Sequence, residues 1–202
     1  TIRTVEQTAG YSSSSSYKKI LNIPANKKLE VLSSSNGRFR VSYKNKKVWI
    51  SNSRVLVNIV DFIPHIDVRL DMAQGKNYFS MGNESISGLT NKRFYTSKGA
   101  RNGTEAWLRY EPAKKLKSAQ SKFLKKGYCI VIFDAYRPYS VTQQFQKLYR
   151  NWLNTKSYSF KSKWFGQLGE GWFLAQNASA HNYGVAIDMT LKKVSTEKLL
   201  AM

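Results

Sequence analysis

The strongest constraint on the fold lies near the start of the chain, where apolar and polar residues largely alternate in short runs. The runs cover residues 29–32, 39–43 and 48–50. Asn36-Gly37 separates the first two runs, and Asn-Gly between alternating segments is a strong signal for a β-hairpin. A second turn is predicted at residues 44–47. Several short strands joined by tight turns predict a small all-β barrel over residues 1–57.

After residue 57 the pattern changes to mixed α and β. Apolar residues at near-helical spacing predict a helix over residues 111–125, which Gly127 would end. A continuous apolar run predicts a buried strand at 128–133. A second helix is predicted over 140–152 with Ser140 as its N-cap, and a further strand at 185–189. We therefore expect two domains, a β domain at 1–57 and an α+β domain at 58–202.

Composition narrows the class of protein. The chain has 33 Lys and Arg against 12 Asp and Glu, a formal net charge of +21. Such a charge favours polyanionic partners, which include nucleic acid, an anionic membrane surface and the teichoic acids of a cell wall. The single cysteine, Cys129, excludes an intrachain disulfide and a Cys-based zinc site. No apolar run is long enough for a membrane span, and a chain starting at Thr1 is expected to have lost any export signal.

The residues that predict chemistry lie in the segment 179–188. His181 and Asp188 are separated by a glycine turn, and the spacing lets an imidazole and a carboxylate converge on one cation. Both groups are ordinary zinc ligands, and a catalytic zinc usually has three protein ligands and a water. The third ligand is not evident, because no histidine follows Asp188. His65 is the only other histidine and the weaker alternative ligand.

A second motif, Asp134-Ala135-Tyr136-Arg137-Pro138, follows the predicted buried strand directly. The planar guanidinium of Arg137 could hold a carboxylate or a developing oxyanion through two hydrogen bonds. The alternatives are a solvated arginine and an ion-pair partner for Asp134. The motif alone favours the alternatives.

Taken together, Ser-x-His-x-x-Gly-x-Ala-x-Asp and the earlier Asp-Ala-Tyr-Arg-Pro resemble the zinc D-alanyl-D-alanine dipeptidases and carboxypeptidases of the vancomycin-resistance type. The likeness extends from about residue 60 to the end and includes residues 66–79. It implies an α+β catalytic domain of the zinc D-Ala-D-Ala peptidase type, in which His181 and Asp188 are zinc ligands. It also implies that Arg137 stabilises the tetrahedral intermediate and that Ser179 lies near the substrate.

The family carries its general base and third ligand in a later Glu-x-x-His motif, which does not occur after Asp188. We therefore expect the catalytic domain to be incomplete at its C-terminus, with a C-terminal fragment of the same protein as a candidate partner. A degenerate, non-catalytic homologue is the alternative.

The first 57 residues resemble the bacterial SH3-like domains of cell-wall enzymes. The residues that carry this likeness are Gly10-Tyr11 with the serine loop at 12–16, Tyr17, the run 29–32, Ser34-Ser35-Asn36-Gly37 and the closing Val48-Trp49-Ile50. The family usually has an aromatic residue directly after Asn-Gly, whereas here Arg38 precedes Phe39. The resemblance implies either peptidoglycan binding or packing against the catalytic domain.

The expected function is zinc-dependent hydrolysis of D-Ala-D-Ala, or of D-Ala-terminated peptidoglycan peptides, by a secreted or cell-wall-associated protein. The choice between dipeptidase and carboxypeptidase stays open. The alternative is a non-catalytic protein that binds peptidoglycan or teichoic acid. Nucleic-acid binding has the charge but no recognisable module, and we expect no membrane span.

Overall fold

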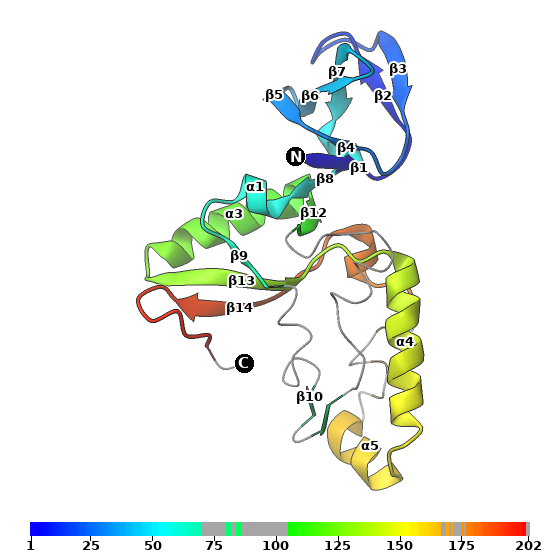
Figure 1. The fold of residues 1–202 in the computed structure, drawn as a ribbon, viewed down its shortest axis with the longest axis vertical. Coiled ribbons are helices and arrows are strands. Elements are labelled where there is room, and N and C mark those ends of the chain that lie inside the picture. Colours follow the sequence, from blue (N-terminus) through cyan, green and yellow to red (C-terminus); the bar gives the residue numbers. More distant parts are fainter. Residues whose placement is uncertain are drawn as a thin grey trace.

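The computed structural model describes residues 1–69, 80–81, 84–85, 105–166, 169, 171, 175 and 177–200. These residues form a mixture of α-helices and mainly antiparallel sheets, which confirms the predicted α+β class (Figure 1). The all-β part lies at one end of the molecule, and α4 and α5 extend toward the other end.

A five-stranded antiparallel sheet with the order β3-β2-β7-β6-β5 makes up most of the N-terminal part. Its strands are β2 (Thr8–Tyr11), β3 (Lys19–Ile23), β5 (Val31–Ser35), β6 (Arg38–Tyr43) and β7 (Lys46–Ser51). The predicted hairpin is confirmed: Ser35 pairs with Arg38 across Asn36-Gly37, and both turn residues have positive φ. The second turn is tighter than predicted, because Lys46 already pairs with Tyr43.

The loop at residues 12–16 has no regular secondary structure, and Arg38 of β6 holds it in place. Arg38 donates hydrogen bonds to the carbonyl oxygens of Ser13 and Ser16. Its guanidinium also lies 4.2 Å from the ring centre of Tyr11, close enough for a cation–π interaction. Arg38, which departs from the pattern of the SH3-like domains, therefore anchors this loop.

A second sheet, in the order β12-β8-β1-β4, joins the two halves of the chain. Its strands are β1 (Ile2–Thr4), β4 (Lys28–Leu29), β8 (Val55–Asn58) and β12 (Trp107–Arg109). The short helices η1 (Asn52–Arg54) and α1 (Ile59–Phe62) flank β8. The expected domain boundary after residue 57 falls inside β8, which pairs with β1 on one side and with β12 on the other.

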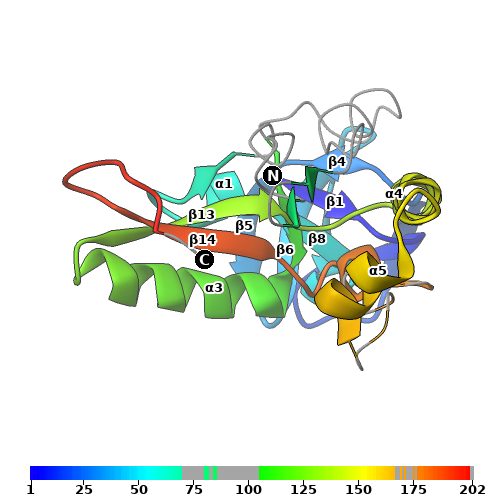
Figure 2. The ribbon, with the colours of Figure 1, turned by 90° about the horizontal axis from the view of Figure 1, so that it is seen from below.

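The third sheet, in the order β14-β13-β9, carries the candidate site. It consists of β9 (Asp67–Val68), β13 (Tyr128–Asp134) and β14 (Asp188–Lys193), and α3 (Tyr110–Leu124) runs beside it (Figure 2). The predictions for α3 and β13 are confirmed, and Gly127 follows the helix with φ +79°. The strand predicted at 185–189 was wrong in its bounds, because Asp188 is the first residue to pair with β13.

The remaining elements are α4 (Tyr139–Leu153), α5 (Tyr158–Phe165), η5 (Ala180–Tyr183) and the pair β10 (Ser80–Met81) and β11 (Glu84–Ser85). The helix predicted at 140–152 is confirmed as α4, but its predicted cap is wrong. Pro138 is the N-cap, and its carbonyl accepts hydrogen bonds from the N–H groups of Val141 and Thr142. Ser140 therefore lies within the first turn. The eight-residue α5 was not predicted.

One hydrophobic cluster extends from the N-terminal sheet to α3 and β13. It contains Val41 and Val48 from β6 and β7, Val57 from β8, and Ile130 and Ile132 from β13, each almost completely buried. The candidate site described below lies at the end of this core, where β13 leaves it.

Candidate metal centre

Two carboxylates meet where β13 ends and β14 begins. Asp134 is the last residue of β13 and Asp188 the first of β14, and they are register partners after an irregularity at residues 132–134. His181 approaches from η5, the short helical turn before β14. Asp134 lies 47 residues before His181 and 54 before Asp188. Strand pairing over this distance, rather than local spacing, brings Asp134 to the other two residues.

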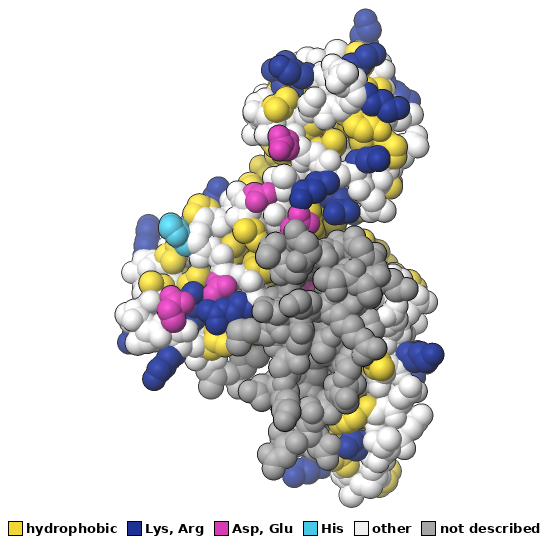
Figure 3. All heavy atoms as spheres, in the orientation of Figure 1, with side chains coloured by type: hydrophobic (Ala, Val, Ile, Leu, Met, Phe, Trp, Pro, Cys, Tyr) yellow, Lys and Arg dark blue, Asp and Glu magenta, His cyan; other side chains and the backbone are white. Residues whose placement is uncertain are grey.

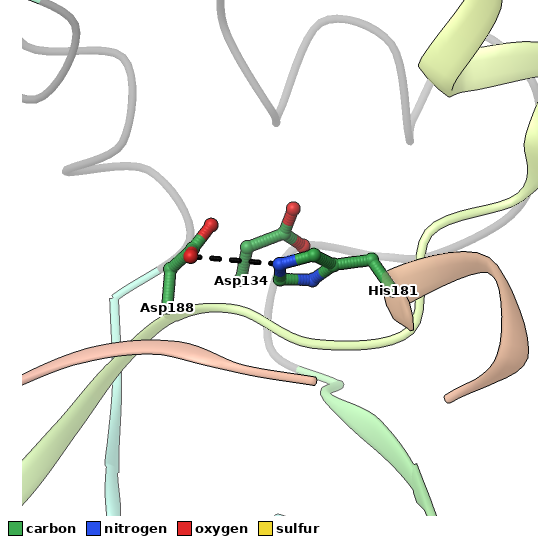
Figure 4. A group of neighbouring side chains, drawn as sticks. All are labelled: Asp134, His181 and Asp188. Atoms are coloured by element: carbon green, nitrogen blue, oxygen red, sulfur yellow. Dashed lines mark ion pairs between the residues drawn. The ribbon is translucent and has the colours of Figure 1, made fainter. Parts of the chain in front are cut away.

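One nitrogen or oxygen from each of Asp134, His181 and Asp188 lies within 4.8 Å of the others. Nε2 of His181 is 3.5 Å from Oδ1 of Asp188. In Figure 4 the imidazole ring points toward Asp188, with Asp134 beside the pair. Among the residues that the structure describes, this is the one group of His, Cys, Asp or Glu side chains that could hold a metal ion.

The orientation of His181 is set by its other ring nitrogen. Nδ1 lies 2.8 Å from the carbonyl oxygen of Ala135. A carbonyl only accepts hydrogen bonds, so Nδ1 carries the proton and the Nε2 lone pair of the neutral ring faces Asp188. Metal-binding histidines characteristically make such a contact to a carbonyl or carboxylate. This tautomer is the one that a metal at Nε2 requires.

The electrostatics of this corner also favour a cation. Burial by itself would lower the pKa of His181, but the hydrogen bond that the protonated Nε2 donates to Asp188 and the charge of Asp134 outweigh burial and raise this pKa above its ordinary value. The field that favours a proton on Nε2 also favours a metal ion in the same place. One imidazole and one carboxylate are donors that zinc accepts, as do other divalent transition metals.

Both carboxylate oxygens of Asp134 already accept hydrogen bonds from other groups. Its Oδ1 accepts a hydrogen bond from the Ala135 N–H at 2.8 Å. Its Oδ2 accepts from Nε and Nη2 of Arg137, at 2.8 and 2.5 Å. Both side chains are buried, and Arg137 Nη2 also lies 3.6 Å from Oδ2 of Asp188. We infer that Asp134 holds Arg137, whereas His181 and Asp188 are the better pair of ligands.

Arg137 therefore lies beside the His181–Asp188 pair but is not solvated. Its side chain is only 5% exposed, and its guanidinium lies over the Phe145 ring of α4. Of the interpretations open from the sequence, the ion pair with Asp134 is present. Arg137 Nη2 nevertheless lies 3.6 Å from Oδ2 of Asp188, so its guanidinium is close enough to contact a group bound at the His181–Asp188 pair.

Asn182 links the two motifs, although its role was not predicted from the sequence. Its Nδ2 donates to the Arg137 carbonyl and to Thr142 Oγ1, both at 2.7 Å. Its Oδ1 accepts from the Ser179 N–H at 2.7 Å. The Arg137 N–H also donates to the His181 carbonyl at 3.0 Å. The only sequence signal was an amide inside the motif, three residues after a serine, as in a capping box.

Ser179 is placed by the same network. It is the N-cap of η5, and its carbonyl accepts a hydrogen bond from the Asn182 N–H. Its Oγ lies 3.4 Å from Asn182 Oδ1. Ser179 thus fixes the start of the turn that carries His181.

Gly184 ends this turn against the β8–β12 sheet. It has φ +68°, and a Cβ there would lie 2.5 Å from Cδ2 of Leu56. Arg109 donates its backbone N–H to the Gly184 carbonyl and its Nε–H to the Tyr183 carbonyl. The glycine is needed both for its backbone conformation and for the close approach of β8.

His65 lies at the opposite end of β13. Its carbonyl oxygen accepts from Gln120 Nε2 and from the Cys129 thiol, and Cys129 is the second residue of β13. The structure thus does not bring His65 to the His181–Asp188 pair. Of the stretch at 66–79 that contributed to the resemblance, residues 66–69 are seen, and residues 70–79 lie outside the described part of the chain.

On the face shown in Figure 3, Lys and Arg side chains are scattered over the described part of the chain among fewer Asp and Glu side chains. None of the described helices combines the length and apolar character needed to cross a bilayer.

Comparison with known proteins adds no family to these observations. No protein-family model matches the chain, and no curated protein matches it either.

Proposed function

We propose that this chain takes part in zinc-dependent hydrolysis of D-Ala-D-Ala, or of D-Ala-terminated peptidoglycan peptides, in the cell wall. The observation that carries the proposal is the convergence of His181, Asp188 and Arg137 at one corner of the β14-β13-β9 sheet. The reaction and substrate class come from the resemblance of the two motifs to the D-Ala-D-Ala peptidases. The SH3-like N-terminal part would then bind peptidoglycan or support the catalytic part.

In this proposal His181 Nε2 and an oxygen of Asp188 hold the zinc ion. Bound there, zinc would polarise the scissile carbonyl and lower the pKa of a water molecule. The Ala135 carbonyl fixes the tautomer of His181 through Nδ1. Arg137 would donate N–H groups to the oxygen that becomes negative during attack, with its guanidinium oriented by Asp134. Ser179 would hold the turn beside the substrate.

The test measures zinc content and D-alanine release by the same protein preparation. We expect about one zinc per chain, release of D-alanine from D-Ala-D-Ala, and loss of that release with a chelator. His181→Ala should abolish zinc binding, because it removes the nitrogen that faces Asp188. His65→Ala is the matched control, since His65 lies at the far end of β13, and it should leave zinc content unchanged. Equal zinc content in all three proteins would refute the assignment of His181.

A second candidate function is a non-catalytic protein that binds the cell wall. The specific observation in its favour is that Asp134, the third member of the cluster, has both oxygens hydrogen-bonded to other groups. Zinc binding without any release of D-alanine from the dipeptide or from D-Ala-terminated peptides would favour this alternative.

A further inference from the structure

Helix α3 and the turn after it present a basic face to solvent. The lysines on this face are Lys114, Lys115, Lys117, Lys122, Lys125 and Lys126, and each is exposed. Glu111 is the one acidic residue of the helix, and it pairs with Lys114. We call these six residues the α3 lysine face.

The opposite side of α3 is occupied by the protein core. Ala113, Leu116 and Gln120 are buried, and Figure 2 shows the helix along one side of the molecule with β13 and β14 on its inner side. The lysine charges therefore lie away from the core, although Lys114 and Lys117 rest over the rings of Tyr110 and Phe62. Lys122 lies three residues from Lys125 and four from Lys126, and like charges at these spacings destabilise a helix. Bound anions would relieve this repulsion.

The arrangement determines which anion fits. Lys115, Lys122 and Lys125 make no ion pair with another described residue, and they lie within about 80° of one another around the helix axis, given 3.6 residues per turn. Lys115 and Lys125 are about 15 Å apart along the axis at 1.5 Å per residue. A row of this length suits a chain of several phosphates better than a single phosphate.

The other polyanions fit less well. Two aromatic rings, Tyr110 and Phe62, lie beside the α3 lysine face, but they are only partly exposed and already lie under Lys114 and Lys117. Single-stranded nucleic acids are held largely by stacking on open rings. A membrane-surface helix inserts its apolar side between lipids, but that side of α3 is buried. The α3 lysine face therefore offers mainly charged contacts, which suit phosphates.

We propose that the α3 lysine face binds a linear alditol-phosphate polymer, a phosphodiester chain without bases. The row of lysines argues for a chain of phosphates, and the choice of an alditol backbone rests on the cell-wall function proposed above. The interaction is electrostatic and independent of the metal centre, so it holds whether or not the chain is a hydrolase. Each lysine that contacts a phosphate displaces a counterion, which makes the affinity depend on salt concentration.

The experiment measures binding of poly(glycerol phosphate) to the full chain at several salt concentrations. The test variant carries Lys115→Gln, Lys122→Gln and Lys125→Gln, and glutamine has nearly the helix propensity of lysine. The matched control carries Lys44→Gln, Lys46→Gln and Lys47→Gln, three exposed lysines around the β6–β7 turn. Both variants lose three charges, and circular dichroism checks that both are folded.

We expect the test variant to bind at least about tenfold more weakly, with the slope of log affinity against log salt reduced by roughly 2 to 3. The control should keep most of the affinity. Equal weakening in both variants would overturn the proposal in favour of diffuse charge attraction. Tighter, α3-dependent binding of a DNA oligonucleotide with the same number of phosphates would overturn the choice of polymer.

Discussion

At the scale of single residues, the candidate centre depends on groups that orient one another. Asp134 holds Arg137, the Ala135 carbonyl orients His181, and Asn182 connects the two segments. His181 and Asp188 were predicted from their chemistry and spacing, whereas the role of Arg137 was expected only from the resemblance to the D-Ala-D-Ala peptidases. The sequence could not reveal that Asp134 would have both oxygens occupied, because that depends on where Arg137 points after the strand ends.

The ion pair between Asp134 and Arg137 leads to a stability prediction. We expect Arg137→Gln to lower the free energy of unfolding by about 3–5 kcal/mol, because it leaves the fully buried Asp134 carboxylate without its charged partner. The free energies would be measured by urea denaturation. The double variant Asp134→Asn/Arg137→Gln should lose clearly less than the two single variants summed. Strict additivity would mean that the two side chains do not depend on each other.

Gly184 gives a prediction that separates backbone strain from steric overlap. Gly184→Ala places a methyl group in a left-handed conformation and against Leu56, and we expect a loss of about 2–4 kcal/mol. Gly127→Ala is the matched control, because it has φ +79° and open space around its Cβ position. It should lose only about 1 kcal/mol. Equal losses in urea denaturation would show that Leu56 moves aside without cost.

At the scale of secondary-structure elements, β9 and β14 are connected by a charged network next to a cavity of about 450 Å³. Asp67 accepts hydrogen bonds from Arg69 and Lys192, at 2.9 Å in each case. Glu197, beyond β14, also pairs with Lys192. β9 and β14 lie on opposite sides of β13. The ion pair between Asp67 and Lys192 therefore reaches across the middle strand and ties the short parallel strand β9 to the sheet.

The network predicts a pH dependence of stability. Burial by itself would raise the pKa of Asp67, but the hydrogen bonds from Arg69 and Lys192 outweigh it, and the pKa is lowered from 3.8. A lowered folded-state pKa gives stability that is fully present above the unfolded value and is lost as pH falls through the folded value. Asp67→Asn should therefore reduce the unfolding midpoint near pH 6, whereas the difference from the unmodified protein should shrink toward about pH 2.

The measurement is the midpoint of urea unfolding at a series of pH values. Asp61→Asn is a useful comparison, because the pKa of Asp61 is also lowered but its side chain is more exposed, so the effect should be smaller. A difference for Asp67→Asn that stays constant down to the lowest pH would contradict an electrostatic origin.

Helices, strands and turns could be predicted wherever a short stretch of sequence carries the signal for them. The turn at Asn36-Gly37, helix α3 and strand β13 follow from residue type and periodicity. The start of β14 was predicted three residues too early, because residues 185–187 alternate like a strand but have no β13 partner. The cap of α4 was misplaced because Ser140 looked suitable while the carbonyl of Pro138 was already in position to accept the first helical hydrogen bonds.

At the scale of the whole molecule, the N-terminal sheets and the α+β part share one core and one sheet. We expect them to unfold together. Val48→Ala removes fully buried methyl groups from the N-terminal part, at a cost of about 1–3 kcal/mol. It should therefore lower the midpoint at which the helical circular dichroism signal is lost, although the long helices α3 and α4 lie in the other part. Val194→Ala, at an exposed position, should change little.

An unchanged helical midpoint in Val48→Ala, with an earlier loss of N-terminal structure, would contradict this coupling. It would mean that the pairing of β8 with β12 is too weak to join the two parts, and that the boundary expected near residue 57 separates independent folding units.

The sequence by itself determined the local structure and the inventory of reactive groups. Turn residues with positive φ, helical periodicity, the lysines of α3 and the motif containing His181 and Asp188 can all be read within short windows. Only the tertiary structure decided how these parts meet. It placed Asp134 beside Asp188, gave Arg137 its partner, set Gly184 against Leu56 and kept His65 away. The reason is physical: strand register and the approach of distant side chains depend on long-range packing, which no short window of residues contains.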